Sequence, residues 1–299
     1  MNTIVLQPRI KLDPSPLVMM ALFLVSLSLI TIQAYAQTAS DHVKESRRIV
    51  SLGGGVTETL FALGIGDEIV AVDVSSVYPL EATQKPKVGY LRATSAEGIA
   101  SMKPSIVIAS EALGPASVKA QLKAAKIKLS LVAEAKSVSA AMARIMSLGQ
   151  LVNREARAQE IISAIESALK SPMPEGAPPK VLFLFSHGGG RLMIAGRKTA
   201  AHTMIKEAGA VNAVTGYDGY KPLTAESVVA AQPDIILLTE RSLSSIKGQE
   251  ALWTIPSLAL TPAGKAKRSV VIGDLKLLGF GPRTGEAILE LRRAFFSSK

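Results

Sequence analysis

The sequence predicts an α/β protein made of two similar Rossmann-like lobes, joined by one long α-helix, with a ligand cleft between the lobes. Three observations indicate this fold. Short apolar runs alternate with helical patterns, one uninterrupted helical pattern occupies the middle of the chain, and the second half repeats motifs of the first. The chain has 299 residues, 48% of them hydrophobic, so it is long enough to bury two modest cores.

The first lobe is predicted from four short apolar runs, each suited to a buried strand. They cover residues 48–52, 69–73, 105–110 and 129–133, with helical patterns between them. Because strands that alternate with helices favour a parallel sheet, we expect an α/β lobe over residues 37–136. The first run ends in Gly53-Gly54-Gly55. This segment is either a tight strand-to-helix turn or a place where the backbone meets a carboxylate of a ligand.

The connection between the lobes is predicted from residues 137–170. This stretch contains no proline, and its apolar residues recur at a spacing close to 3.6. The pattern predicts one connecting helix over 137–170, which ends before the proline-rich tract from Pro172 to Pro179. Two shorter helices broken near Gly149 are the alternative, because a glycine inside a helix costs about 1 kcal/mol relative to alanine.

An internal repeat predicts the second lobe, over residues 171–299. Ala96-Glu97 and the apolar run at 106–108 match Ala225-Glu226 and the apolar run at 235–237, each 129 residues further on. The run at 181–186 also leads into His187-Gly188-Gly189-Gly190, which echoes the run before Gly53. Matched units in matched order imply two similar lobes, whose ligand binds beyond the carboxyl ends of the strands.

The N-terminus predicts export. Arg9 and Lys11 precede an uncharged run over residues 17–32, which Ala34-Tyr35-Ala36 follows. This order is typical of a signal peptide over residues 1–36 that is cleaved after Ala36. The alternative is an uncleaved anchor helix, although the 16-residue run is shorter than the ~20 residues of a bilayer span. Because the chain has no cysteine, we expect a periplasmic location for residues 37–299.

Composition and motifs restrict the chemistry. The formal charge is +10, and it becomes +9 once residues 1–36, with two basic residues and one acidic residue, are removed. A basic chain favours an anionic ligand, but its few scattered aromatic residues do not suit nucleic acid. The sequence has no dinucleotide or Walker A motif, no nucleophile elbow, and three histidines without zinc-site spacing. We therefore expect no enzymatic reaction, and an exported α/β enzyme that uses Tyr90 or His187 is the alternative.

Tyr90 and His187 are the candidate ligating residues. Tyr90 lies in Val88-Gly89-Tyr90-Leu91-Arg92, just before a helix for which Thr94 to Glu97 predict a capping box. A phenolate can bind ferric iron, and Arg92 supplies a cation that favours the anionic oxygen. Taken alone, however, these residues favour a tyrosine that anchors its loop through the hydroxyl. His187 stands at the end of a strand, and a lone histidine is more often a packing residue than a ligand.

The specific motifs are Gly89-Tyr90-Leu91-Arg92 and Ser186-His187-Gly188-Gly189, and weaker matches extend over residues 48–296. With these motifs the chain resembles the periplasmic substrate-binding proteins of bacterial heme ABC transporters. These belong to a helical-backbone class that also carries cobalamin and ferric siderophores. The resemblance implies that Tyr90 ligates heme iron, that Arg92 keeps the phenol oxygen anionic, and that His187 is a possible second ligand.

The resemblance also implies how the cargo is held and delivered. Glu97 and Glu226 match the carboxylates through which this class docks on an inner-membrane ABC permease with its ATPase, and the repeat supports them independently. Basic residues would meet the heme propionates, and the candidates are Arg191, Lys198 and Arg283. We expect a monomer whose cargo is heme. Cobalamin or a ferric siderophore is the alternative cargo for the same fold.

Overall fold

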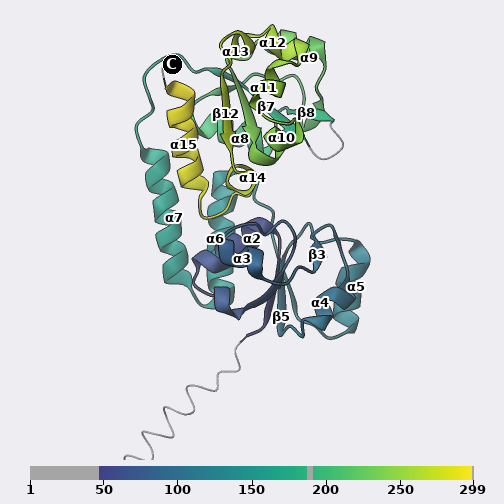
Figure 1. Ribbon diagram of the computed structural model, residues 1–299. Helices are drawn as coiled ribbons and strands as arrows, with labels where there is room; N and C mark the ends of the chain where they lie inside the picture. Colours follow the sequence, from purple (N-terminus) through teal and green to yellow (C-terminus); the bar gives the residue numbers. More distant parts are fainter. Residues whose placement is uncertain (1–46, 187–190, 298–299) are drawn as a thin grey trace, which may run out of the picture. The chain divides into compact units, whose positions relative to one another are not determined.

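The structure is a computed structural model, which describes residues 47–186 and 191–297 (Figure 1). The predicted signal peptide and His187 lie outside these ranges. Within them, no helix is both long enough and apolar enough to cross a membrane. All the elements below belong to the compact unit that begins at Arg47.

The first lobe is built on a four-stranded parallel sheet, as the alternating apolar runs predict. The strand order is β2-β1-β5-β6. The strands are β1 (Ile49–Leu52), β2 (Ile69–Val72), β5 (Ile106–Ser110) and β6 (Leu129–Val132). They coincide with the four predicted runs to within one residue.

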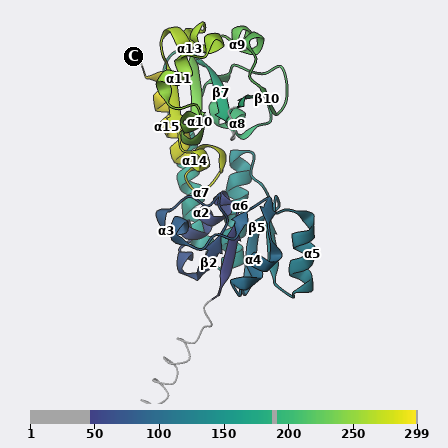
Figure 2. The same cartoon turned by 45° about the vertical axis from the view of Figure 1, so that its right-hand side comes forward.

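Helices cover both faces of this sheet (Figure 2). They are α2 (Gly54–Ala62), the 3₁₀ turn η1 (Gly66–Glu68), α3 (Leu80–Gln84), α4 (Ala96–Ser101) and α5 (Ala116–Ala124). Alternate strand residues divide between two cores. Ile106 and Ile108 pack with α2, whereas Val107 and Ala109 pack with α4 and α5.

The second lobe has a mixed sheet in the order β10-β8-β7-β11-β12, with β9 also paired to β7. Its strands are β7 (Lys180–Ser186), β8 (Leu192–Ala195), β9 (Val211–Asn212), β10 (Tyr220–Pro222), β11 (Ile235–Thr239) and β12 (Ser269–Ile272). β7 and β8 are antiparallel neighbours. β1 leads through Gly53 into the helix α2, whereas the next described strand after β7 is its antiparallel neighbour β8. The predicted echo between the two glycine runs falls on residues 187–190, which lie outside the described residues.

The helices of the second lobe complete the repeat. They are α8 (Ala200–Glu207), α9 (Ala225–Ala231), α10 (Glu240–Ser245), α11 (Gln249–Trp253), α12 (Pro256–Ala259), α13 (Pro262–Lys265), α14 (Asp274–Leu278) and α15 (Thr284–Phe296). α9 and β11 follow α4 and β5 at the predicted separation of 129 residues. β5 lies between β1 and β6, and β11 lies between β7 and β12. The prediction of two similar α/β lobes is confirmed.

The connection differs from the single predicted helix. Two helices, α6 (Val138–Val152) and α7 (Glu155–Lys170), pack against each other as a hairpin. α6 ends because Asn153 adopts the left-handed conformation, with φ 57° and ψ 52°. Gly149 lies inside α6 and does not break it. A Cβ there would stand 2.6 Å from the Cβ of Ala158, so glycine lets the two helices approach closely.

The hairpin joins the cores of the two lobes. α6 packs on α2 of the first lobe, whereas α7 packs on α15, which runs beside it in Figure 1. One hydrophobic cluster is continuous from Ile49 of β1, through Ile145 and Ile165 of the hairpin, to Phe183 of β7. Each sheet has a second cluster on its other face. The described part of the chain thus connects its lobes through packed apolar side chains.

Candidate functional site

Tyr90 projects from a short β-hairpin of the first lobe. β3 (Gly89–Tyr90) pairs with β4 (Ala93–Thr94), and Gly89 has a positive φ of 103°. The Thr94 hydroxyl donates to the Val88 carbonyl at 2.7 Å, and the Leu91 side chain is buried. The Tyr90 side chain is 42% exposed, and its hydroxyl has no hydrogen-bond partner among the described residues. The hairpin therefore presents the phenol at the lobe surface rather than using its hydroxyl as an anchor there.

Arg92 lies on the turn of the same hairpin. Its Nη2 is 3.2 Å from Oε1 of Glu134, and the two side chains are 59% and 37% exposed. Exposed pairs of this kind contribute only about 0–1 kcal/mol, so another anion can replace Glu134 at little cost. A pocket of about 480 Å³ opens beside Arg92, and Glu111 and Lys136 also line it.

Glu97 and Glu226 occupy the same position in their helices, the second residue of α4 and of α9. Both are exposed. The predicted capping box from Thr94 to Glu97 is wrong, because Ser95 is the N-cap and accepts from the Gly98 amide at 2.9 Å. In α9 the box forms between Thr224 and Ser227. Neither carboxylate is used for capping, so both stay available at the lobe surfaces.

Two of the predicted propionate partners lie in the second lobe beyond β7. Arg191 is exposed and directly follows residues 187–190. Lys198, with a φ of 57°, forms an ion pair with Asp218 at 2.7 Å, and Arg197 binds the same carboxylate at 3.0 Å. The hydrogen bond from Lys198 lowers the pKa of Asp218, with the charge of Arg197 acting in the same direction. Asp218 is thus a carboxylate that both Lys198 and Arg197 contact.

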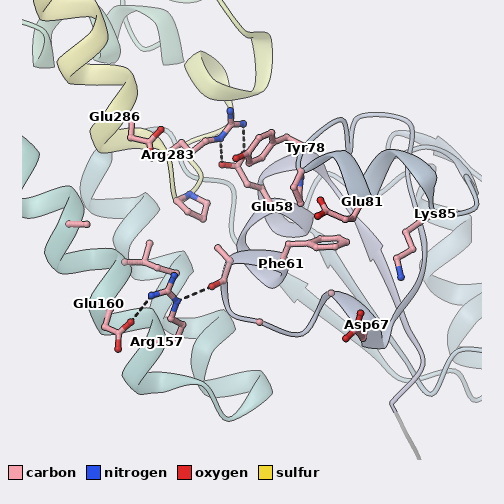
Figure 3. A pocket seen from close by; sticks show the side chains of 17 residues that line it. Glu58, Phe61, Asp67, Tyr78, Glu81, Lys85, Arg157, Glu160, Arg283 and Glu286 are labelled. Atoms are coloured by element: carbon pink, nitrogen blue, oxygen red, sulfur yellow. Dashed lines mark hydrogen bonds and ion pairs between the residues drawn. The ribbon is translucent and has the colours of Figure 1, made fainter.

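Arg283, the third predicted propionate partner, is engaged elsewhere (Figure 3). Its Nε and Nη2 bind both carboxylate oxygens of Glu58, at 2.7 and 3.1 Å. The guanidinium also lies 3.4 Å from the centre of the Tyr78 ring. Burial alone would lower the pKa of Arg283, but the hydrogen bond and charge of Glu58 outweigh it and raise that pKa. These groups line a pocket of about 700 Å³ that Tyr90 and Arg92 do not line.

A second buried arginine links the same segments. Arg144 of α6 is 8% exposed and donates to the carbonyl oxygens of Gly279 and Phe280, at 2.7 and 2.8 Å. Burial lowers the pKa of Arg144 to about 10, although the charges of Glu58 and Glu134 oppose this. Its Nε has no partner among the described residues. A Cβ at Gly55 would stand 2.7 Å from this guanidinium, which explains the third glycine of the run.

The first glycine of the run binds a carboxylate of the chain itself, and the Gly54 amide donates to the Ser75 hydroxyl. Asp73 is fully buried and accepts from the Gly53 amide at 2.8 Å. It also accepts from the amide and hydroxyl of Ser75 and from the hydroxyl of Ser76. The anion position at the start of α2 is therefore filled, and the run is a tight turn rather than a site for a ligand carboxylate.

Sequence reasoning missed Tyr220 and Glu58. Tyr220 follows Gly219 and precedes α9, just as Tyr90 follows Gly89 and precedes α4. The internal repeat does contain this tyrosine, but the second half has one residue fewer between the tyrosine and the glutamate that follows it. Glu58 lies 225 residues from Arg283, and no local pattern indicates so distant a partner.

Comparisons with known proteins identify the fold's relatives. A family model described as a periplasmic binding protein matches residues 49–274. The structure of the periplasmic heme-binding protein RhuT from Roseiflexus sp. RS-1, in apo form, is 41% identical with a TM-score of 0.80. The match covers 84% of this chain and 98% of that one.

Two curated relatives match by sequence. The ABC transporter substrate-binding lipoprotein YvrC of Bacillus subtilis, itself uncharacterized, is 31% identical over 260 residues, 85% of this chain and 81% of that protein. The vitamin B12-binding protein of Vibrio parahaemolyticus is 25% identical over 257 residues, 84% of this chain and 90% of that protein. The chain belongs to the periplasmic binding protein family, whose matched members include substrate-binding proteins of ABC transporters.

Proposed function

We propose that this protein captures heme in the periplasm and delivers it to an inner-membrane ABC permease and its ATPase, without carrying out a reaction. The observation that carries the proposal is the exposed Tyr90 phenol on its hairpin, two residues from Arg92. The 41% identity to a periplasmic heme-binding protein supports it.

The β3–β4 hairpin carries side chains whose chemistry suits ferric heme. Ferric iron favours an anionic oxygen, and tyrosinate is a known axial ligand of heme iron. Arg92 is the cation that this proposal places at the Tyr90 oxygen, and its exposed pair with Glu134 costs little to exchange. In this proposal Tyr90 ligates the iron and Arg92 supports the phenolate, while His187 is a second ligand candidate outside the described residues.

The propionates need cations at the rim of the site. Arg191 is exposed and Lys198 is 80% exposed, so both can bind a propionate without unpairing a buried group. Arg283 would have to give up its buried pair with Glu58, so we rank it below the other two. Delivery would use Glu97 and Glu226, one on each lobe of a monomer.

Cobalamin is the second candidate cargo, because a vitamin B12-binding protein is among the relatives. A ferric siderophore is a third candidate with the same fold. Neither needs a tyrosinate ligand, so the Tyr90 phenol separates these candidates from heme.

Titration of the purified mature protein with hemin tests the proposal, with cyanocobalamin as the competing ligand. We expect stoichiometric hemin binding with a Soret band and a high-spin charge-transfer band, and no displacement by cyanocobalamin. Tyr90→Phe should remove the charge-transfer band and weaken hemin binding. Loss of a residue that only supports a metal ligand weakens metal binding by ~10–100-fold, and loss of the ligand itself should cost more.

Tyr78→Phe is the matched control, because Tyr78 belongs to the same lobe and is also 42% exposed. This variant should bind hemin as the wild type does. An unchanged spectrum in Tyr90→Phe would remove Tyr90 from the site, and binding of cyanocobalamin but not hemin would refute heme as the cargo.

A further inference from the structure

The internal repeat pairs Tyr90 of the first lobe with Tyr220 of the second. Each tyrosine follows a glycine with positive φ, 103° at Gly89 and 82° at Gly219. Each precedes a short helix whose second residue is an exposed glutamate. The two side chains are almost equally exposed, 42% for Tyr90 and 41% for Tyr220. The second lobe therefore presents an exposed phenol shortly before α9, as the first lobe does before α4.

Tyr220 is the outer member of a row of three aromatic rings. Phe183 and Phe185 of β7 are stacked, with ring centres 6.2 Å apart and planes inclined by 22°. The ring of Phe185 lies 6.0 Å from that of Tyr220, inclined by 47°. Phe183 is fully buried and Phe185 is half-buried. The row leads from the core of the second lobe to its surface.

The row reaches the surface where a ligand is expected. Phe185 is the residue before the last of β7, so the pair it forms with Tyr220 lies at the carboxyl end of this strand. Ligands of open α/β sheets bind beyond the carboxyl ends of strands. Arg191, which the proposed function places at a propionate, follows this end of β7 in the sequence.

The lysine next to Tyr220 in the sequence contacts a different aromatic ring. Lys221 lies over the ring of Tyr217, 4.5 Å from the ring centre. Burial raises the pKa of Tyr220. Tyr220 is therefore a neutral phenol at neutral pH, and its ring rather than an anionic oxygen is what it can offer to a cargo.

We propose that Phe185 and Tyr220 form an aromatic wall of the second lobe, which packs against the face of a flat porphyrin macrocycle whether or not that macrocycle holds iron. This inference rests on the proposed function for the identity of the cargo. It assigns a different role to each lobe: Tyr90 of the first lobe binds the metal, and the aromatic wall of the second lobe contacts the ring system.

Hemin and metal-free protoporphyrin IX separate the two roles. Tyr220→Ala should weaken the binding of both ligands about equally, by about tenfold, because an aromatic contact is lost in each case. Tyr220→Phe keeps the ring and should bind both ligands as the wild type does. Tyr90→Phe should weaken hemin binding while it leaves protoporphyrin IX binding nearly unchanged.

Val211→Ala is the control variant. Val211 is an exposed apolar residue of the same sheet, but it pairs with Lys180 at the opposite end of β7. It should bind both ligands normally, and thermal melting should show that all variants are folded.

The outcomes distinguish this inference from the proposed function. Unchanged affinities in Tyr220→Ala, with hemin still bound by the wild type, would overturn the aromatic wall alone. Loss of hemin binding in Tyr220→Phe would also overturn it, because the hydroxyl would then be the essential group. If the wild type binds protoporphyrin IX but not hemin, and Tyr220→Ala weakens that binding, the iron-based function fails and the wall stands. If it binds neither ligand, both proposals fail.

Discussion

The buried Glu58 carboxylate is hydrogen-bonded by Arg283. Its side chain is 2% exposed, and that of Arg283 is 18% exposed. The guanidinium satisfies both carboxylate oxygens and stacks on Tyr78, so neither charge is left without a partner. Because Glu58 lies on α2 and Arg283 directly precedes α15, this pair also ties the first lobe to the second.

Glu58→Gln should lower the free energy of unfolding by about 3 kcal/mol, because removing one partner leaves the guanidinium buried without a counter-charge. Urea unfolding followed by circular dichroism measures it. Glu160→Gln is the control, since Glu160 and Arg157 form an exposed pair on α7 whose loss should cost less than about 1 kcal/mol. Equal effects of the two variants would show that the buried pair adds nothing to stability.

His202 makes stability depend on pH. Burial lowers the pKa of His202 below its usual 6.5, and the charges of Lys206 and Arg197 act in the same direction. Its Nδ1 lies 3.2 Å from Nδ2 of Asn212, an amide that donates, so the neutral ring is the form that fits. The unfolded chain binds the proton more readily. Stability is therefore complete above about pH 6.5 and falls as the pH drops toward the lower pKa of the folded state.

His202→Gln should flatten this dependence, because glutamine keeps an acceptor and does not titrate. Urea unfolding at about pH 7.5 and about pH 5 measures the difference for each protein. A drop of the same size in the variant and the wild type would assign the pH dependence to other groups.

At the residue level, the sequence predicts equivalent positions where the repeat duplicates them and misses a partner that is distant in the chain. Glu97 and Glu226 occupy equivalent helix positions 129 residues apart, as the repeat predicts, and their docking role stays a prediction. Arg283 was predicted to meet a propionate because it is basic, and nothing near it in the sequence indicates that Glu58 is its partner. Net charge alone does not tell a free cation from a paired one.

At the level of elements, the strands of the first sheet and β7 and β11 of the second were predicted, whereas β8, β12 and the form of the connection were not. Each buried strand is a short apolar run bounded by polar or glycine residues, and those signals are local. The hairpin of α6 and α7 contains no proline, and its turn needs only one residue, Asn153, in the left-handed conformation. Both helices carry apolar stripes with the same period, so the pattern reads as continuous across the turn.

Gly149 tests the packing of this hairpin. Gly149→Ala should lower the free energy of unfolding by about 1–3 kcal/mol, because the new Cβ would stand 2.6 Å from that of Ala158. Helix propensity alone predicts the opposite effect, an increase of ~1 kcal/mol in the free energy of unfolding. Ala158→Gly, combined with Gly149→Ala, should restore part of the loss, and a double-mutant cycle measures the coupling. A stabilised Gly149→Ala would mean that the helices adjust without strain.

At the level of the whole described unit, the two lobes share a plan and a continuous core. The cluster that runs from β1 through α6 and α7 to β7 joins the sheets, and Arg144 and Arg283 add polar links between the same parts. An assembly of this kind presents two equivalent acidic positions, Glu97 and Glu226, on one body. A two-fold symmetric permease could then meet one carboxylate on each lobe.

Reversing both charges, as Glu97→Lys with Glu226→Lys, should leave hemin affinity unchanged. Heme uptake into vesicles that contain the permease and its ATPase should fall by on the order of tenfold for each reversal, because complementary charges steer and orient the encounter. Glu166→Lys with Glu175→Lys is the charge-matched control, since both residues are exposed and neither follows the repeat. The net charge changes equally in the two double variants. If uptake falls only in the Glu97→Lys, Glu226→Lys variant, the permease contact is at these two glutamates on the lobe surfaces. Equal uptake by both would place the permease contact elsewhere on the protein.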